Sequence, residues 1–215
     1  MRVVIVGNGK PTANYSDIDH ADVIVRLNNA RHYKSSLVGT RTTVLMVRAA
    51  SHPHGQLVAN GPPEWQIPKE VISQVERLLV VDTRSPIRDV STGQAIHPYE
   101  HFILRHKRLE NVLIDVVPVS FADETRRVAE TNSDPTIGTI AINWALQEFG
   151  SPIEIAGFEW NTTNDIHGHN YEAEQRWIED KLRDGQLIVA HREPAPGSPL
   201  AGTCPPSGHS LSTRC

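Results

Sequence analysis

Short apolar runs alternate with amphipathic stretches over most of the chain. Three runs rich in β-branched residues lie near the N-terminus, and each predicts a strand, at residues 3–6, 22–27 and 42–47. Because these runs are apolar at almost every position, we expect both faces of each strand to be buried, as in a parallel sheet. Farther along, similar runs predict strands at 79–82, 112–119, 153–156 and 187–190, and helical periodicity predicts helices at 69–78, 98–109, 121–129, 136–149 and 170–183.

The alternation of strands with helices is typical of an α/β protein. We therefore predict a single Rossmann-like, doubly wound and mainly parallel sheet. The length of 215 residues and the hydrophobic content of 39% suit one domain, which we place at residues 1–191. Residues 49–68 are rich in Pro, Gly and His and predict an exposed loop, whereas the Pro-, Gly- and Ser-rich residues 192–215 predict a disordered tail.

The charge balance, the length of the apolar runs and the positions of the cysteines predict which partners and which compartment to expect. The 21 basic and 25 acidic residues give a formal charge of −4, which supplies no basic field for nucleic acid, so we predict no nucleic-acid partner. No apolar run is long enough to span a bilayer, which predicts no transmembrane segment. Both cysteines, Cys204 and Cys215, lie in the last dozen residues, and a cytoplasmic location is the simplest expectation.

Polar residues follow the first two predicted strands, where a doubly wound sheet binds its ligands. The first strand ends in the loop 7–11, Gly-Asn-Gly-Lys-Pro, but Thr12 stands where a dinucleotide fingerprint has its third glycine. A tight turn explains this loop as well as a ligand does. The second strand ends in Asn28 and Asn29, whose amides, with that of Asn8, suit a ligand with phosphate and sugar hydroxyl groups. A solvated turn would explain Asn29 alone equally well.

The segment before the helix at 136–149 has the features of an anion site. Asp134 is suited to cap the helix, Pro135 to occupy its first turn, and Gly138 to leave the first amides uncovered. A phosphate or carboxylate would dock at these amides beside the hydroxyls of Thr136 and Thr139. A capped helix without a ligand remains the alternative. Three arginines, Arg41, Arg48 and Arg84, are possible partners of a carboxylate, with simple solvation as the competing interpretation.

Two histidines and several carboxylates crowd the start of the helix at 170–183. His167 or His169 is a candidate general base, because an imidazole titrates near neutral pH. The two histidines with Glu172 are also a candidate metal site. Surface histidines near a helix start are the third interpretation.

Together these segments resemble the sialylmotifs of glycosyltransferase family 29 and, more distantly, the bacterial sialyltransferases of family 42. Residues 4–8, 17–28 and 38–43 are similar to the long motif, and residues 134–138 through 157–158 to the short motif. His169, four residues and Glu174 resemble the very short motif. The three motifs occur in the order that the family has.

The resemblance implies an inverting, metal-independent transfer on a GT-A-like variant of the Rossmann fold, without a cofactor. The donor would be sialic acid or a related keto-sugar acid, such as Kdo, activated with cytidine monophosphate (CMP), and the acceptor a hydroxyl of a glycan, glycolipid or polysaccharide. By carry-over, His169 is the base. The residues that would bind nucleotide or substrate are Asn8, Gly9, Asn28, Thr136, Ile137, Gly138, Phe158 and Glu174.

The chain departs from the family pattern at several points. The cysteines that usually join the long and short motifs are missing, with Val3 near one expected position, and Ile137 replaces a hydroxyl residue. The His-Tyr motif is absent, so that His167 is an alternative base. These departures leave open a catalytically degenerate CMP- or nucleotide-binding protein. A metal-dependent hydrolase that uses His167, His169 and Glu172 is a further alternative.

Overall fold

A seven-stranded, all-parallel sheet forms the centre of the protein. The computed structural model describes residues 1–11, 13–33, 35, 37–48, 67–82, 87–88, 95–96, 112–159 and 168–190. The strand order is β7-β4-β3-β2-β1-β8-β9, and all neighbouring strands are parallel. The chain first adds strands on one side of β1 and then, from β8, on its other side, so the strand order reverses between β1 and β8. The strands are β1 (Val3–Val6), β2 (Val23–Leu27), β3 (Val44–Arg48), β4 (Arg77–Val81), β7 (Leu113–Val117), β8 (Ile153–Ala156) and β9 (Leu187–Val189), and the short β5 (Ile87–Arg88) and β6 (Ala95–Ile96) form a separate antiparallel pair.

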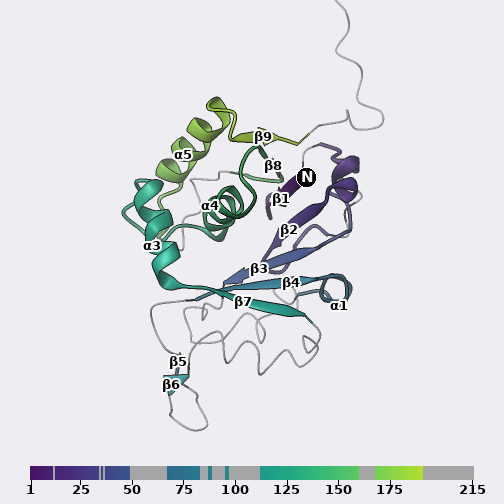
Figure 1. The fold of residues 1–215 in the computed structure, drawn as a ribbon, viewed down its shortest axis with the longest axis horizontal. Coiled ribbons are helices and arrows are strands. Elements are labelled where there is room, and N and C mark those ends of the chain that lie inside the picture. Colours follow the sequence, from purple (N-terminus) through teal and green to yellow (C-terminus); the bar gives the residue numbers. More distant parts are fainter. Residues whose placement is uncertain are drawn as a thin grey trace, which may run out of the picture.

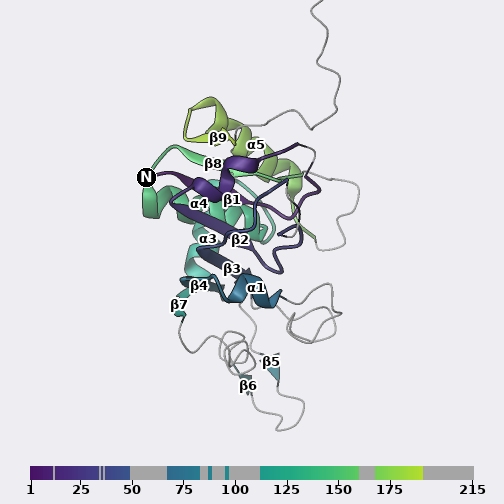
Figure 2. The same cartoon turned by 90° about the vertical axis from the view of Figure 1, so that its right-hand side faces the viewer.

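Helices cover both faces of this sheet, as the apolar strands predict. Figure 1 shows α3 (Val119–Val128), α4 (Ile137–Phe149) and α5 (Tyr171–Arg183) to the left of the sheet, and η1 (Ser16–His20) and α1 (Lys69–Ile72) to its right. Turning the molecule by 90° keeps α5 beside β9 and α1 beside β4 (Figure 2). The predicted α/β, doubly wound fold is therefore confirmed.

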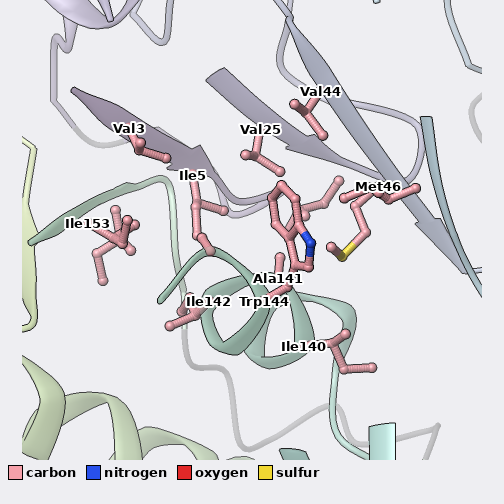
Figure 3. Close-up of a cluster of buried hydrophobic side chains, with 14 of the residues drawn as sticks. Val3, Ile5, Val25, Val44, Met46, Ile140, Ala141, Ile142, Trp144 and Ile153 are labelled. Atoms are coloured by element: carbon pink, nitrogen blue, oxygen red, sulfur yellow. The ribbon is translucent and has the colours of Figure 1, made fainter. Parts of the chain in front are cut away.

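The main core lies between the sheet and α4. Alternate residues of the strands, such as Ile5, Val25 and Met46, point toward this helix and pack against Ile140 and Trp144 (Figure 3). Burial extends around most of α4, since every residue from Gly138 to Ala145 is buried. Because α3 and α5 cover its outer side, α4 is an internal helix whose position determines where its N-terminus lies.

Most of the predicted elements are confirmed, with boundaries that differ by one or two residues. The prediction of a helix over 69–78 is wrong, because α1 ends at Ile72 and strand β4 begins at Arg77. The backbone N–H groups of Glu76 and Arg77 donate to Thr43 O and so begin the pairing with β3. Pairing with a strand that is distant in the sequence therefore overrides the helical periodicity of these residues.

Several predictions fall outside the described residues. They are the helix at 98–109, most of the loop at 49–68, and the tail. Within the described ranges, none of the helices combines the length and the apolarity that crossing a bilayer requires.

A buried arginine joins two parts of the long motif. The guanidinium of Arg26, the next-to-last residue of β2, donates to Val38 O at 2.7 Å and Gly39 O at 2.8 Å. Burial lowers the pKa of Arg26 to about 10, although the charge of Asp19 favours the protonated form. The Asp19 carboxylate in turn accepts from the backbone N–H of Arg41 at 2.8 Å. These bonds hold residues 38–41 against the sheet and so place the start of β3.

The loops after β1 and β8 cross in direct backbone contact. Gly7 N donates to Ala156 O and Gly9 N to Gly157 O, each at 2.8 Å. A Cβ added to Gly7 would lie 2.5 Å from Gly157 O, and one added to Gly9 would lie 2.7 Å from the same oxygen. Glycine is therefore needed at both positions because another backbone, rather than a ligand, approaches them.

We expect Gly7→Ala to destabilise the protein by about 1–3 kcal/mol, because the new methyl group overlaps Gly157 O and the two loops must separate. Urea-induced unfolding measures this change. An unfolding midpoint equal to that of the wild type would contradict the close crossing of the loops.

Candidate active site

A cavity of about 390 Å³ opens at the carboxyl edge of the sheet, where the strand order reverses. Its walls come from the ends of β1, β2, β3 and β8 and from the starts of α4 and α5. This is where a doubly wound sheet binds ligands. The lining residues are Gly7, Asn8, Gly9, Leu27, Asn28, Arg48, Thr136, Ile137, Gly138, Gly157, Phe158, Glu159, His169 and Tyr171.

The cavity brings together eight of the ten residues predicted for the site. They are Asn8, Gly9, Asn28, Thr136, Ile137, Gly138, Phe158 and His169. The other two are Glu174, which is not among the lining residues, and His167, which lies outside the described residues. Glu159 and Tyr171 also line the cavity but are not among the predicted site residues, although each lies close in the sequence to a predicted one, Phe158 and His169 respectively.

The Asn8 amide fastens the loop after β1 to the loop after β2. Its Nδ2 donates to Leu27 O at 3.1 Å and to Asn29 Oδ1 at 3.4 Å, and its Oδ1 accepts from Arg31 N at 3.1 Å. Both amide hydrogens are thus used within the protein. The second lone pair of Oδ1 is what this side chain retains for a ligand.

Asn28 shapes the next part of the cavity wall. Its φ of 49° lies in the left-handed region, which asparagine tolerates better than most residues. The Asn28 Oδ1 accepts from the backbone N–H of Arg48 at 3.1 Å and so joins the ends of β2 and β3. Its Nδ2 donates no hydrogen bond to the described residues, which leaves this donor for a ligand.

Glu174 holds the start of α4 from behind the cavity. Its side chain is fully buried, and its carboxylate accepts from Thr136 N at 3.0 Å, from the Thr136 hydroxyl at 2.6 Å and from the Thr139 hydroxyl. The prediction of Asp134 as the cap is wrong, since Thr136 is the N-cap and its Oγ1 accepts from Thr139 N. Thr136 rather than Asp134 caps the helix because the Glu174 carboxylate anchors Thr136 at the position where the helix begins.

Two backbone donors at the start of α4 remain available to a ligand. The N–H groups of Ile137 and Gly138 have no acceptor within the helix, and no other partner is seen among the described residues. Gly138 also leaves room for the Phe158 ring, which would lie 2.9 Å from a Cβ added there. The two amides and the aromatic ring therefore form one side of the cavity.

His169 is fixed at the same helix start. Its Nδ1 lies 2.7 Å from Asp134 O, and since a carbonyl oxygen only accepts, Nδ1 carries the hydrogen. The other ring nitrogen, Nε2, is then the unprotonated one in the neutral side chain. Asn170, the N-cap of α5, donates its backbone N–H to Ser133 Oγ at 2.8 Å and holds this segment beside residues 132–136.

Of the three arginines considered as carboxylate partners, one lines the cavity. Arg48, at the end of β3, donates from Nη2 to Pro135 O at 2.7 Å. Burial lowers the pKa of its guanidinium, while the charges of Asp134 and Glu174 act in the opposite direction. Arg41 instead donates to backbone oxygens of residues 19 and 21, and Arg84 lies outside the described residues.

The predicted metal-binding group is only partly described. Glu172, one of its three members, forms an exposed ion pair with Arg176 at 2.7 Å. In the parts of the chain that the structure describes, no group of three His, Cys, Asp or Glu side chains is placed to hold a metal ion.

We expect Glu174→Gln to destabilise the protein by about 1–3 kcal/mol, because a side-chain amide replaces one oxygen that accepts hydrogen bonds in a buried site. Glu172→Gln on the same helix is the matched control, and it should change stability by no more than about 0.5 kcal/mol since Glu172 is exposed. Urea unfolding of both variants measures the difference. Equal stabilities of the two variants would contradict the anchoring role of Glu174.

Solved structures with a similar fold include sialyltransferases. A mammalian sialyltransferase in complex with Gal-beta-1-3GalNAc-ortho-nitrophenol is 16% identical, with a TM-score of 0.52 over 87% of this chain and 68% of that chain. A variant of the sialyltransferase Cst-II in complex with CMP is 12% identical, with a TM-score of 0.52 over 88% and 81% of the two chains. At these identities, the likeness shows a shared fold.

No curated protein matches this chain. The model of glycosyltransferase family 29 (sialyltransferase), however, matches residues 1–184. This match covers every described element of the sheet except β9 and all of the residues that line the cavity. The chain therefore belongs to glycosyltransferase family 29, the sialyltransferases.

Proposed function

We propose that this chain transfers sialic acid, or a related keto-sugar acid such as Kdo, from a CMP-activated donor to a hydroxyl of a glycan acceptor. The transfer inverts the anomeric centre and uses His169 as the general base. The observation that carries this proposal is the placement of His169, whose ring is oriented by Asp134 O at the start of α4, inside the cavity of a family 29 protein.

The orientation of His169 suits removal of a proton. The hydrogen bond from Nδ1 to Asp134 O leaves Nε2 with a lone pair that accepts the proton of an acceptor hydroxyl. Since Asn170 is bonded to Ser133, the ring is held without help from a substrate. A base that is already in position lowers the entropic cost of bringing it to the acceptor.

The other residues of the cavity suit a nucleotide sugar. The Phe158 ring lines the cavity beside Gly7 and Gly9 and offers a flat surface for the nucleoside. The N–H groups of Ile137 and Gly138 are suited to the phosphate, whose negative charge grows as it leaves. Ile137 has lost the side-chain hydroxyl of the family motif but keeps this backbone donor.

We further propose a reducing compartment, such as the cytoplasm. Both cysteines come after residue 200, whereas the long and short motifs that the family's disulfide would join lie within residues 4–158. Val3, near one of the expected positions, is buried and packs in an apolar core with Ile153 and Trp144. Hydrophobic packing takes the place that a disulfide would have.

A thermal-shift comparison of nucleotides tests the donor class. We expect CMP to raise the melting temperature, because a ligand that binds only the folded state stabilises it, while UMP and NAD at equal concentration have little effect. A shift with NAD but none with CMP would contradict the proposal.

His169→Ala should reduce turnover of CMP-sialic acid by about 10²- to 10⁴-fold while CMP binding persists, because the variant loses the base and keeps the nucleotide contacts. His167→Ala is the matched control and should retain turnover. The rate of CMP release with and without the acceptor measures both. Loss of activity in His167→Ala alone would move the base to His167.

The same assay separates the remaining alternatives. A wild-type protein that binds CMP without any turnover would be the degenerate binding protein. Stoichiometric zinc in the purified protein, together with activity lost in EDTA, would support the hydrolase that uses His167, His169 and Glu172.

A further inference from the structure

The cavity contains very little positive charge for a donor with two anionic groups. Among its described lining residues, Arg48 is the only lysine or arginine, and Glu159 contributes a negative charge. A CMP-activated keto-sugar acid carries both a phosphate and a carboxylate. Two partners are therefore needed inside a protein whose formal charge is −4.

The N-terminus of α4 supplies less positive potential than an ordinary helix start. The buried Glu174 carboxylate already accepts the Thr136 N–H and the Thr136 and Thr139 hydroxyls. Its negative charge offsets much of the partial positive charge of the helix dipole. What the helix keeps for a ligand is a pair of neutral donors, the N–H groups of Ile137 and Gly138.

Arg48 is a partly buried cation at the wall of the cavity, where its guanidinium is held by a hydrogen bond. Among the described residues, its guanidinium makes one hydrogen bond, from Nη2 to Pro135 O, and forms no ion pair, although the charges of Asp134 and Glu174 act on it. The other N–H groups of the guanidinium fork match the two oxygens of a carboxylate.

Arg48 and the base are held by consecutive carbonyl groups. Asp134 O accepts from His169, and Pro135 O accepts from Arg48. Both hydrogen bonds end on the same two-residue segment before α4, so the guanidinium and the His169 ring lie near each other at the wall of the cavity. In an inverting displacement the acceptor hydroxyl and its base face the leaving phosphate across the anomeric carbon. The carboxylate, which is bonded to that same carbon, lies beside this path and within reach of a group next to the base.

We propose that Arg48 binds the carboxylate of the donor sugar and makes the enzyme selective for sugar acids over neutral CMP-linked sugars. This inference rests on the proposed function, since it takes the donor to be a CMP-activated sugar acid. The phosphate is then left to the N–H groups of Ile137 and Gly138 and to the amide of Asn28. Arg48 is a binding and specificity residue, and the proton transfer remains with His169.

Calorimetry with three ligands tests this assignment. Cytidine carries neither anionic group, CMP adds the phosphate, and the unreactive 3-fluoro analogue of CMP-sialic acid adds the carboxylate. We expect Arg48→Gln to weaken binding of the analogue by about tenfold or more while cytidine and CMP bind almost as to the wild type. Arg48→Lys should recover part of the loss, because it keeps the charge without the fork.

Arg31→Gln is the matched control. It removes an equal charge from the same edge of the sheet, but Arg31 is exposed and does not line the cavity, so all three affinities should be unchanged. Its contact with Asn8 uses the backbone N–H and survives the substitution. An equal loss of analogue binding in Arg31→Gln and Arg48→Gln would show a general charge effect and overturn the inference.

Two other outcomes also overturn it. If Arg48→Gln weakens CMP and the analogue equally, Arg48 binds the phosphate. If it weakens cytidine as well and lowers the melting temperature, Arg48 only supports the fold through Pro135. Failure of the wild type to bind any of the three ligands would instead contradict the proposed function, so that the two failures are distinguishable.

Discussion

The buried carboxylate of Glu174 is the interaction on which the site depends. It joins α5 to the start of α4 through Thr136 and Thr139, in a position where water cannot replace a lost partner. Because His169 lies immediately before α5, the same bond that begins α4 at residue 137 also places His169, the proposed base. Two helices that are distant in the sequence thus present one surface to the cavity.

This arrangement has an electrostatic consequence. A helix start that is already paired with a carboxylate retains N–H donors but little net positive potential. Among the described lining residues, the positive charge then comes from the end of β3, where burial lowers the pKa of Arg48 while the charges of Asp134 and Glu174 act in the opposite direction. A guanidinium keeps its proton under such conditions, so this charge remains available to an anionic donor.

The glycines of the loop after β1 resemble part of a dinucleotide fingerprint, but in this fold they serve the contact between two loops. Gly7 and Gly9 are required by the backbone of the crossing loop after β8, whereas the Asn8 amide is used mainly to join the loops after β1 and β2. The missing third glycine of a dinucleotide fingerprint therefore has a structural reason. The helix whose start lines the cavity is α4, which follows far along the chain, and not a helix directly after β1.

The sequence by itself determined the parallel sheet, the helix at 136–149 and the order of the motifs, because periodicity and β-branched runs depend on local residue types. It also indicated most of the lining residues, since strand ends in a doubly wound sheet meet at one edge. Only the tertiary structure decided that residues 77–81 pair with β3, that Glu174 supports the cavity from behind, and that Arg48 rather than Arg41 reaches it. These outcomes depend on which backbone atoms lie next to a side chain after folding, and contacts between residues distant in the chain leave no local pattern.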